Sequence, residues 1–124
     1  MRRLPRAEPE IAALTLVVTQ GLGQAAEDFP TPPPHPGEML REEFLIPVGM
    51  SQMELAKRIR VSYPRVNEII NGKRGITPDT ALRLARLFGT SAEFWLNGQR
   101  NWDLWHAMRS PDARVIRRIK PVAA

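Results

Sequence analysis

Residues 51–75 read SQMELAKRIRVSYPRVNEIINGKRG, and two short helices are predicted from them. Ser51 and Glu54 have the Ser-x-x-Glu spacing of a capping box, which starts a helix by satisfying its free backbone amides. The apolar side chains that follow at helical spacing are Leu55, Ala56 and Ile59. Only two residues then precede Ser62, which has the properties of a second helix start.

The second helix has its own start, buried side and end. Pro64 falls in its first turn, where the missing N–H costs little. Asn71 and Gly72 end it, because glycine accepts the left-handed backbone of a helix terminus. The side chains predicted to be buried are Val66, Ile69 and Ile70. A turn this short sets two helices roughly perpendicular, so residues 51–72 are predicted to form a helix-turn-helix.

The outward side of the second helix carries side chains that can recognise DNA. Arginine pairs with guanine, asparagine with adenine and glutamate with cytosine, while tyrosine and proline can touch a thymine methyl group. The residues predicted to contact bases are Tyr63, Pro64, Arg65, Asn67 and Glu68. Those predicted to contact phosphates are Gln52, Ser62, Asn71, Lys73 and Arg74.

The charge of this stretch supports the same interpretation. Residues 51–75 hold six Lys and Arg against two Glu, within a chain of net charge +5. Basic charge concentrated in a short segment is typical of a phosphate-binding surface. One alternative is a solvated helix face without function. Another is an interaction module in which the helix-turn-helix is only a scaffold.

The remainder of the folded part is also predicted to be helical. One helix is expected over 38–46, ended by Pro47 and Gly49. Another begins at Thr77 and is closed by Gly89, and a last one runs to Met108 from a capping box of Thr90 and Glu93. The fold class is therefore all-α, a five-helix domain preceded by an extended or partly disordered N-terminal segment.

Four segments are expected along the 124 residues. Residues 1–28 form an N-terminal extension, predicted to be poorly ordered, and residues 29–36 form a linker with five prolines. The helix-turn-helix domain with a C-terminal dimerisation helix spans 37–109, followed by a basic tail over 110–124. The tail either adds nonspecific DNA affinity or docks on a partner. The apolar run near the N-terminus is too short to span a bilayer, and no membrane association is expected.

Catalysis, metals and cofactors are not expected. The sequence has no cysteine, which excludes disulfides, thiol nucleophiles and cysteine-based zinc sites. His35 and His106 lack neighbouring ligands in the sequence, and the adjacent Glu42 and Glu43 point in different directions on a helix. The chain is therefore predicted not to be an enzyme and to have no cofactor, metal or small-molecule substrate.

The tryptophans near the C-terminus indicate an interface. Trp95 is expected in the core, whereas Trp102 and Trp105 are assigned to a homodimer interface, since aromatic residues concentrate at interface centres. Intramolecular packing or contact with a protein partner are the alternatives. A two-fold dimer would place its recognition helices about 34 Å apart, on a palindromic operator of double-stranded DNA.

Several stretches resemble known families. Residues 51–74 resemble the helix-turn-helix of lambda-repressor-like proteins. The stretches HPGEML (35–40), NGKRGITP (71–78) and GTSAEFWLN (89–97) resemble the HigA family of antitoxins from toxin–antitoxin modules. The chain departs from the family at Arg60, where members usually have glycine in the turn. Either the turn differs here, or Arg60 accepts a strain of about 1 kcal/mol and gains a phosphate contact.

The resemblance implies a cytoplasmic homodimer that represses its own operon and neutralises a HigB-type RNase toxin. It also implies base readout by Tyr63, Arg65, Asn67 and Glu68. The alternative is a stand-alone phage- or plasmid-type repressor without a toxin, which shares every DNA-binding feature.

Overall fold

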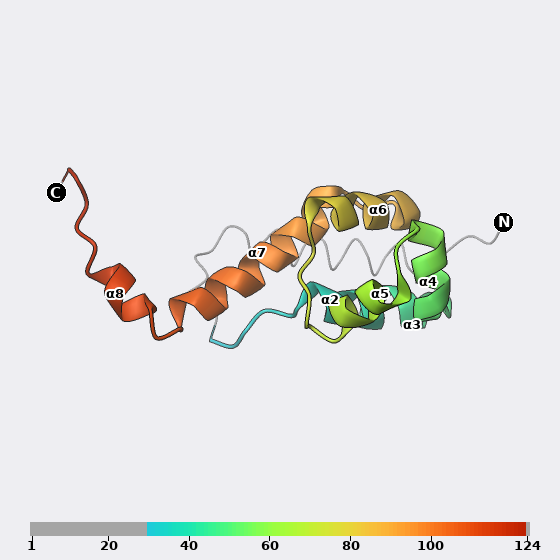
Figure 1. Ribbon diagram of the computed structural model, residues 1–124, viewed down its shortest axis with the longest axis horizontal. Coiled ribbons are helices and arrows are strands. Elements are labelled where there is room, and N and C mark those ends of the chain that lie inside the picture. Colours follow the sequence, from blue (N-terminus) through green and yellow to red (C-terminus); the bar gives the residue numbers. More distant parts are fainter. Residues whose placement is uncertain (1–29, 124) are drawn as a thin grey trace.

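The computed structural model describes residues 30–123, and the regular structure in this range is helical (Figure 1). Four helices begin after a serine or threonine whose side-chain oxygen accepts a hydrogen bond from the amide three residues later. This bond satisfies one of the free amides at each helix start. The helices are α4 (Gln52–Ile59), α5 (Tyr63–Ile70), α6 (Pro78–Phe88) and α7 (Ala92–Met108), capped by Ser51, Ser62, Thr77 and Ser91. The prediction of an all-α fold is confirmed.

The first helix is longer than the predicted 38–46. It runs without interruption through α2 (Pro36–Met39), the π-helical segment η2 (Leu40–Leu45) and α3 (Ile46–Val48). In η2 the chain makes a wider turn, and the amide of Ile46 donates to the carbonyl oxygen of Arg41 five residues back. This wider turn directly precedes Pro47, which has no N–H to donate. The helix therefore passes through the proline and ends at Gly49, whose φ is 72°.

The start of the last long helix differs by one residue from the prediction. Ser91 caps α7, because its side-chain oxygen accepts the amide of Phe94 at 3.0 Å. The neighbouring Thr90 instead accepts a hydrogen bond from the indole Nε1 of Trp95, at 2.8 Å. The prediction that Thr90 caps this helix is wrong, since its hydroxyl is used by a buried tryptophan.

An aromatic cluster occupies the core. The ring of Phe44, in η2, lies 4.9 Å from Trp95 and 5.0 Å from Phe88, measured between ring centroids. Phe94 is the fourth member, at 6.0 Å from Phe44. Phe44 and Trp95 have no exposed surface. Tilted and edge-to-face pairs of this kind stabilise a core beyond their burial alone. The cluster joins the first helix to α6 and α7.

The C-terminal part of the described chain extends away from the other helices. Figure 1 shows α7 leaving the other helices along its C-terminal half, with the short helix α8 (Ala113–Arg117) beyond it. Helix α8 lies within the segment expected to be a basic tail. The expectations for residues 1–28 lie outside the described residues. Within residues 30–123, none of the helices combines the length and the hydrophobicity needed to cross a membrane.

Candidate nucleic-acid interface

Helices α4 and α5 form the pair expected from the sequence. Only residues 60–62 separate them, and the amide of Val61 closes the end of α4 by donating to the carbonyl of Ala56 at 3.0 Å. Ala56 is 4% exposed, so its small side chain is buried, as expected for the crossing of the two helices. Val66 and Ile69 are buried on the inner side of α5. The outer side of α5 is thereby held at a fixed angle to α4.

The turn between these helices contains a backbone outlier. Arg60 has φ 61° and ψ 47°, the left-handed conformation, and the other positive φ angles in the described residues belong to glycines. A residue with a Cβ pays about 1–2 kcal/mol for this conformation. The turn therefore keeps the left-handed geometry usual for glycine, with arginine in its place. The possibility that the turn itself differs is excluded.

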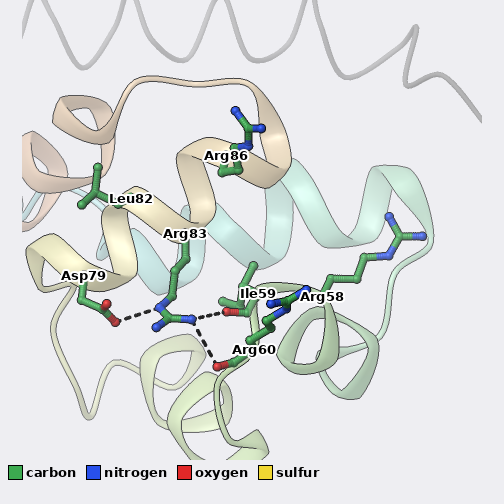
Figure 2. Close-up of a pocket in the computed structure, with 7 residues that line it drawn as sticks. All are labelled: Arg58, Ile59, Arg60, Asp79, Leu82, Arg83 and Arg86. Carbon is green, nitrogen blue, oxygen red and sulfur yellow. Dashed lines mark hydrogen bonds and ion pairs between the residues drawn. The ribbon is translucent and has the colours of Figure 1, made fainter.

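An arginine of α6 closes the end of α4. The Nη1 atom of Arg83 donates to the carbonyl oxygens of Ile59 at 2.7 Å and Arg60 at 3.2 Å (Figure 2). The last carbonyls of a helix have no partner within it, and a cation beside them is favourable. Its Nε atom also donates to Asp79, at 2.9 Å. Arg83 thus fixes the turn to α6.

Asp79 continues this network to the outward side of α5. Its carboxylate also accepts from Nη2 of Arg65 at 2.7 Å, and the same nitrogen lies 2.6 Å from the hydroxyl of Thr80. Hydrogen bonds from Arg83 and Arg65 hold the pKa of Asp79 below its ordinary value. Arg65, predicted to contact a base, is therefore engaged within the protein by α6. Sequence reasoning did not identify Asp79, Thr80 and Arg83, because their bonds to Arg65 and to the turn after α4 span 14 to 24 residues.

A chain of amide side chains links the start of α4 to the end of α5. The Nδ2 atom of Asn67 donates to Gln52 at 3.0 Å, and Nδ2 of Asn71 donates to Asn67 at 3.2 Å. Gln52 and Asn67 are half-buried, whereas Asn71 is exposed. The structure brings together three residues that were assigned to bases or phosphates. Their remaining donors and acceptors are of the kind that bind phosphate and base edges.

The other predicted contacts lie at the two ends of α5. Tyr63 is 43% exposed, and Ser62 and Pro64 beside it are exposed as well. At the opposite end, Glu68 accepts from Nε of Arg74 at 2.8 Å, and Lys73 is exposed. The exposed aromatic and apolar surface at the start of α5 is thus separated from the basic group at its end.

Trp102 and Trp105 lie in the C-terminal half of α7 (Ala92–Met108), and both are half-buried. The ring of Trp102 contacts both histidines, with centroids 5.1 Å from His35 and 4.1 Å from His106. The guanidinium of Arg109 lies 4.0 Å from the ring centre of Trp105, a cation–π contact. The two histidines, distant in sequence, therefore meet at one tryptophan.

His35 also caps the first helix. Its Nδ1 atom accepts the amide of Gly37 at 2.9 Å, and the side chain is buried. Burial lowers the pKa of the His35 imidazole below 6.5, while the carboxylates of Asp103 and Glu38 oppose the shift. The neutral ring is also the form that can accept at Nδ1.

Comparison with known proteins identifies the family. The model of the helix-turn-helix family matches residues 40–95. The virulence-associated protein I of Dichelobacter nodosus is 52% identical over 89 residues, which span 72% of this chain and 81% of that protein.

Two solved structures agree with this result. The antitoxin HigA of Pseudomonas aeruginosa, solved with the higBA promoter, is 43% identical and has a TM-score of 0.68, covering 73% of this chain and 98% of that one. An addiction module antidote protein of the HigA family from Coxiella burnetii is 44% identical, with a TM-score of 0.67 and coverage of 73% and 99%. Together with the helix-turn-helix geometry, this similarity, which spans nearly all of the two solved proteins and 73% of this chain, shows that the chain belongs to the HigA family of helix-turn-helix proteins.

Proposed function

We propose that this protein is a sequence-specific transcriptional repressor and the antitoxin of a HigB-type RNase toxin, and that it represses its own operon as a cytoplasmic homodimer. The observation that carries the proposal is the α4–α5 pair, fixed by Arg83 and presenting the polar side of α5. The similar HigA protein of P. aeruginosa was solved with promoter DNA. A helix held in this way can enter a major groove without rearrangement.

In this proposal the base contacts come from Tyr63, Pro64, Asn67 and Glu68. The side chains at the two ends of the helix pair hold the DNA backbone, and these are Gln52, Ser62, Asn71, Lys73 and Arg74. Asn67 and Gln52 are already hydrogen-bonded to each other, so a contact of Gln52 with phosphate would fix the direction of the Asn67 amide. Phosphate contacts position the protein, whereas base contacts select the sequence.

For Arg65 we propose a positioning role. Its guanidinium is hydrogen-bonded to Asp79 and Thr80, and pairing with guanine would require exchange of that ion pair. By holding the start of α5 to α6, Arg65 sets the angle at which the helix meets DNA. Substitution of Asp79, which contacts no DNA in this arrangement, distinguishes the two roles.

DNA binding is tested with a duplex covering the promoter upstream of the gene, by fluorescence anisotropy at several salt concentrations. Asn67→Ala should reduce the preference for the promoter over random DNA, whereas Lys73→Ala should weaken both and flatten the salt dependence. Asp79→Ala should weaken promoter binding as Arg65→Ala does. If Asp79→Ala instead binds as tightly as wild type while Arg65→Ala loses specificity, Arg65 reads a base.

The antitoxin role is tested in cells. Expression of the small open reading frame adjacent to the gene should arrest growth, and co-expression of this protein should restore it. Continued arrest, or a harmless neighbour, would leave a stand-alone repressor as the function, because promoter binding does not depend on a toxin.

The homodimer is proposed to form through the projecting half of α7, with Trp102 and Trp105. Leu104, in the same half, is 42% exposed, so apolar surface is available beside the tryptophans. Sedimentation equilibrium should give a dimer for the wild-type chain and a monomer for Leu104→Asp. A dimer that persists in Leu104→Asp would contradict this location.

A further inference from the structure

A pocket of about 320 Å³ lies between the C-terminal end of α4 and the outer side of α6. Figure 2 shows the side chains that line it, and we refer to it as the arginine pocket. Its lining includes Arg58, Arg60, Arg83 and Arg86, with Asp79 and Leu82. The lining thus has four arginines and a single carboxylate, so the pocket has a local excess of positive charge.

Two of these arginines have no anionic partner among residues 30–123. Asp79 already accepts from Arg83 and from Arg65, and Arg58 is paired with Glu54 at 3.1 Å. Within residues 30–123, neither Arg60 nor Arg86 forms an ion pair, and both are exposed. Two guanidinium groups are therefore available to bind an anion.

The conformation of Arg60 is a second, independent observation. The chain places glycine at Gly49, Gly72 and Gly89, the other positive-φ positions of the described residues, but arginine at this one. Backbone strain that glycine would relieve is characteristic of positions where the side chain has a use. The strained residue is the one whose side chain lines the pocket.

The pocket also has an apolar part. Leu82 is 63% exposed, and a phosphate backbone offers nothing to cover it. Ser51 and Arg60 cap opposite ends of α4, whose eight residues extend about 12 Å. Gln52, a proposed phosphate contact, lies at the end of α4 remote from the pocket, whereas Ser62 and Tyr63 follow Arg60 closely, so binding of promoter DNA has to be measured separately.

From these observations we propose that the arginine pocket docks an acidic segment of a partner protein. Carboxylates of that segment pair with Arg60 and Arg86, and an aliphatic side chain between them packs on Leu82. This inference does not depend on the toxin or on the operator, so it can fail while the proposed function holds, and the reverse.

The test uses the full chain and a fluorescein-labelled peptide with the sequence Glu-Asp-Glu-Leu-Asp-Glu, together with a version that has glycine for leucine. Arg60→Gly and Arg86→Ala should each weaken binding of the leucine peptide about tenfold. Glycine fits the left-handed turn, so Arg60→Gly is expected to fold. Leu82→Ala should weaken the leucine peptide without affecting the glycine version. Arg100→Ala, an exposed arginine of α7 outside the pocket, is the matched control and should bind as wild type.

Binding of promoter DNA by the same variants distinguishes an acidic protein segment from a DNA phosphate as the occupant of the pocket. Arg86→Ala and Leu82→Ala should bind the promoter duplex with unchanged affinity and salt dependence. Reduced DNA affinity with a flatter salt dependence in Arg86→Ala would assign the pocket to the DNA backbone and overturn the proposal. Failure of the wild-type chain to bind the leucine peptide, or an equal loss in Arg100→Ala, would also overturn it.

Discussion

Gly37→Ala tests a close approach of two helices in the fold. Gly37 lies in α2, where that helix meets the end of α5. A Cβ atom at this position would lie 1.8 Å from the carbonyl oxygen of Ile69 and 3.0 Å from the Cα atom of Ile70. Both are backbone atoms and cannot rotate away. Alanine therefore requires α2 and α5 to separate by about 1 Å or more.

The expected cost follows from this geometry. Overpacking a core costs about 1–3 kcal/mol of stability where side chains can move aside. A clash with backbone atoms, which cannot move aside, should cost about 3 kcal/mol or more. We expect Gly37→Ala to lower the free energy of unfolding by about 3 kcal/mol. For a domain of this size, that corresponds to a fall in Tm of roughly 12–24 °C. Thermal and urea unfolding followed by far-UV circular dichroism measure both quantities.

Gly98→Ala is the matched control, because it also adds one methyl group at a buried glycine beside α2. Its Cβ would lie 3.4 Å from Cε of Met39 and 3.5 Å from Cγ of Pro36, which are ordinary contacts with side-chain atoms. Alanine is favoured over glycine inside a helix by up to about 1 kcal/mol, so the stability should be unchanged or higher. If Gly37→Ala were as stable as Gly98→Ala, the close packing of α2 on α5 would be refuted.

Three further predictions concern single hydrogen-bonded side chains. Because burial holds the pKa of His35 below 6.5, the unfolded chain binds a proton at this imidazole more readily than the folded chain does. The free energy of unfolding should therefore fall as the pH drops below about 6.5. The fall should be smaller in His35→Asn, which keeps a side chain that can cap the helix but cannot be protonated in this range. Ser91→Ala should cost about 1 kcal/mol in urea unfolding and Ser91→Gly only a few tenths; equal stability of Ser91→Ala and wild type would contradict the cap. Thr90→Val leaves the buried Trp95 indole N–H unpaired and should cost about 1–3 kcal/mol, whereas Thr90→Ser retains the hydroxyl and most of the stability; similar losses in the two variants would argue against the hydrogen bond.

The helix boundaries that rest on local chemistry could be predicted from the sequence. Ser51, Ser62 and Thr77 cap their helices through bonds spanning three residues, and such bonds depend only on neighbouring residue types. Thr90 could not be distinguished from Ser91 in this way, because the deciding contact is with the indole of Trp95 in the core. The extension of the first helix past Pro47 also depends on the unusual turn of η2, which has no local sequence signal.

In the candidate interface too, the features set by local sequence could be predicted and those set by distant contacts could not. The sequence identified the residue types on the outer side of α5, because the buried side is fixed by periodicity. It could not show that Arg65 is bonded to α6, since its partners lie 14 and 15 residues away. An arginine that reaches toward DNA and one that reaches toward a neighbouring helix have the same sequence pattern.

The sharing of Asp79 between Arg65 and Arg83 has a consequence for how mutations combine. Residues that share a partner show epistasis, so the effect of two substitutions differs from the sum of each alone. Variants selected at Arg65 for a new operator would leave Asp79 to Arg83 alone, and their effect would depend on which residue occupies position 83. A library that varies α5 while keeping α6 constant would therefore sample only part of the available specificities. Positions 65, 79 and 83 should therefore be varied together, because the shared ion pairs make the effect of each substitution depend on the other two residues.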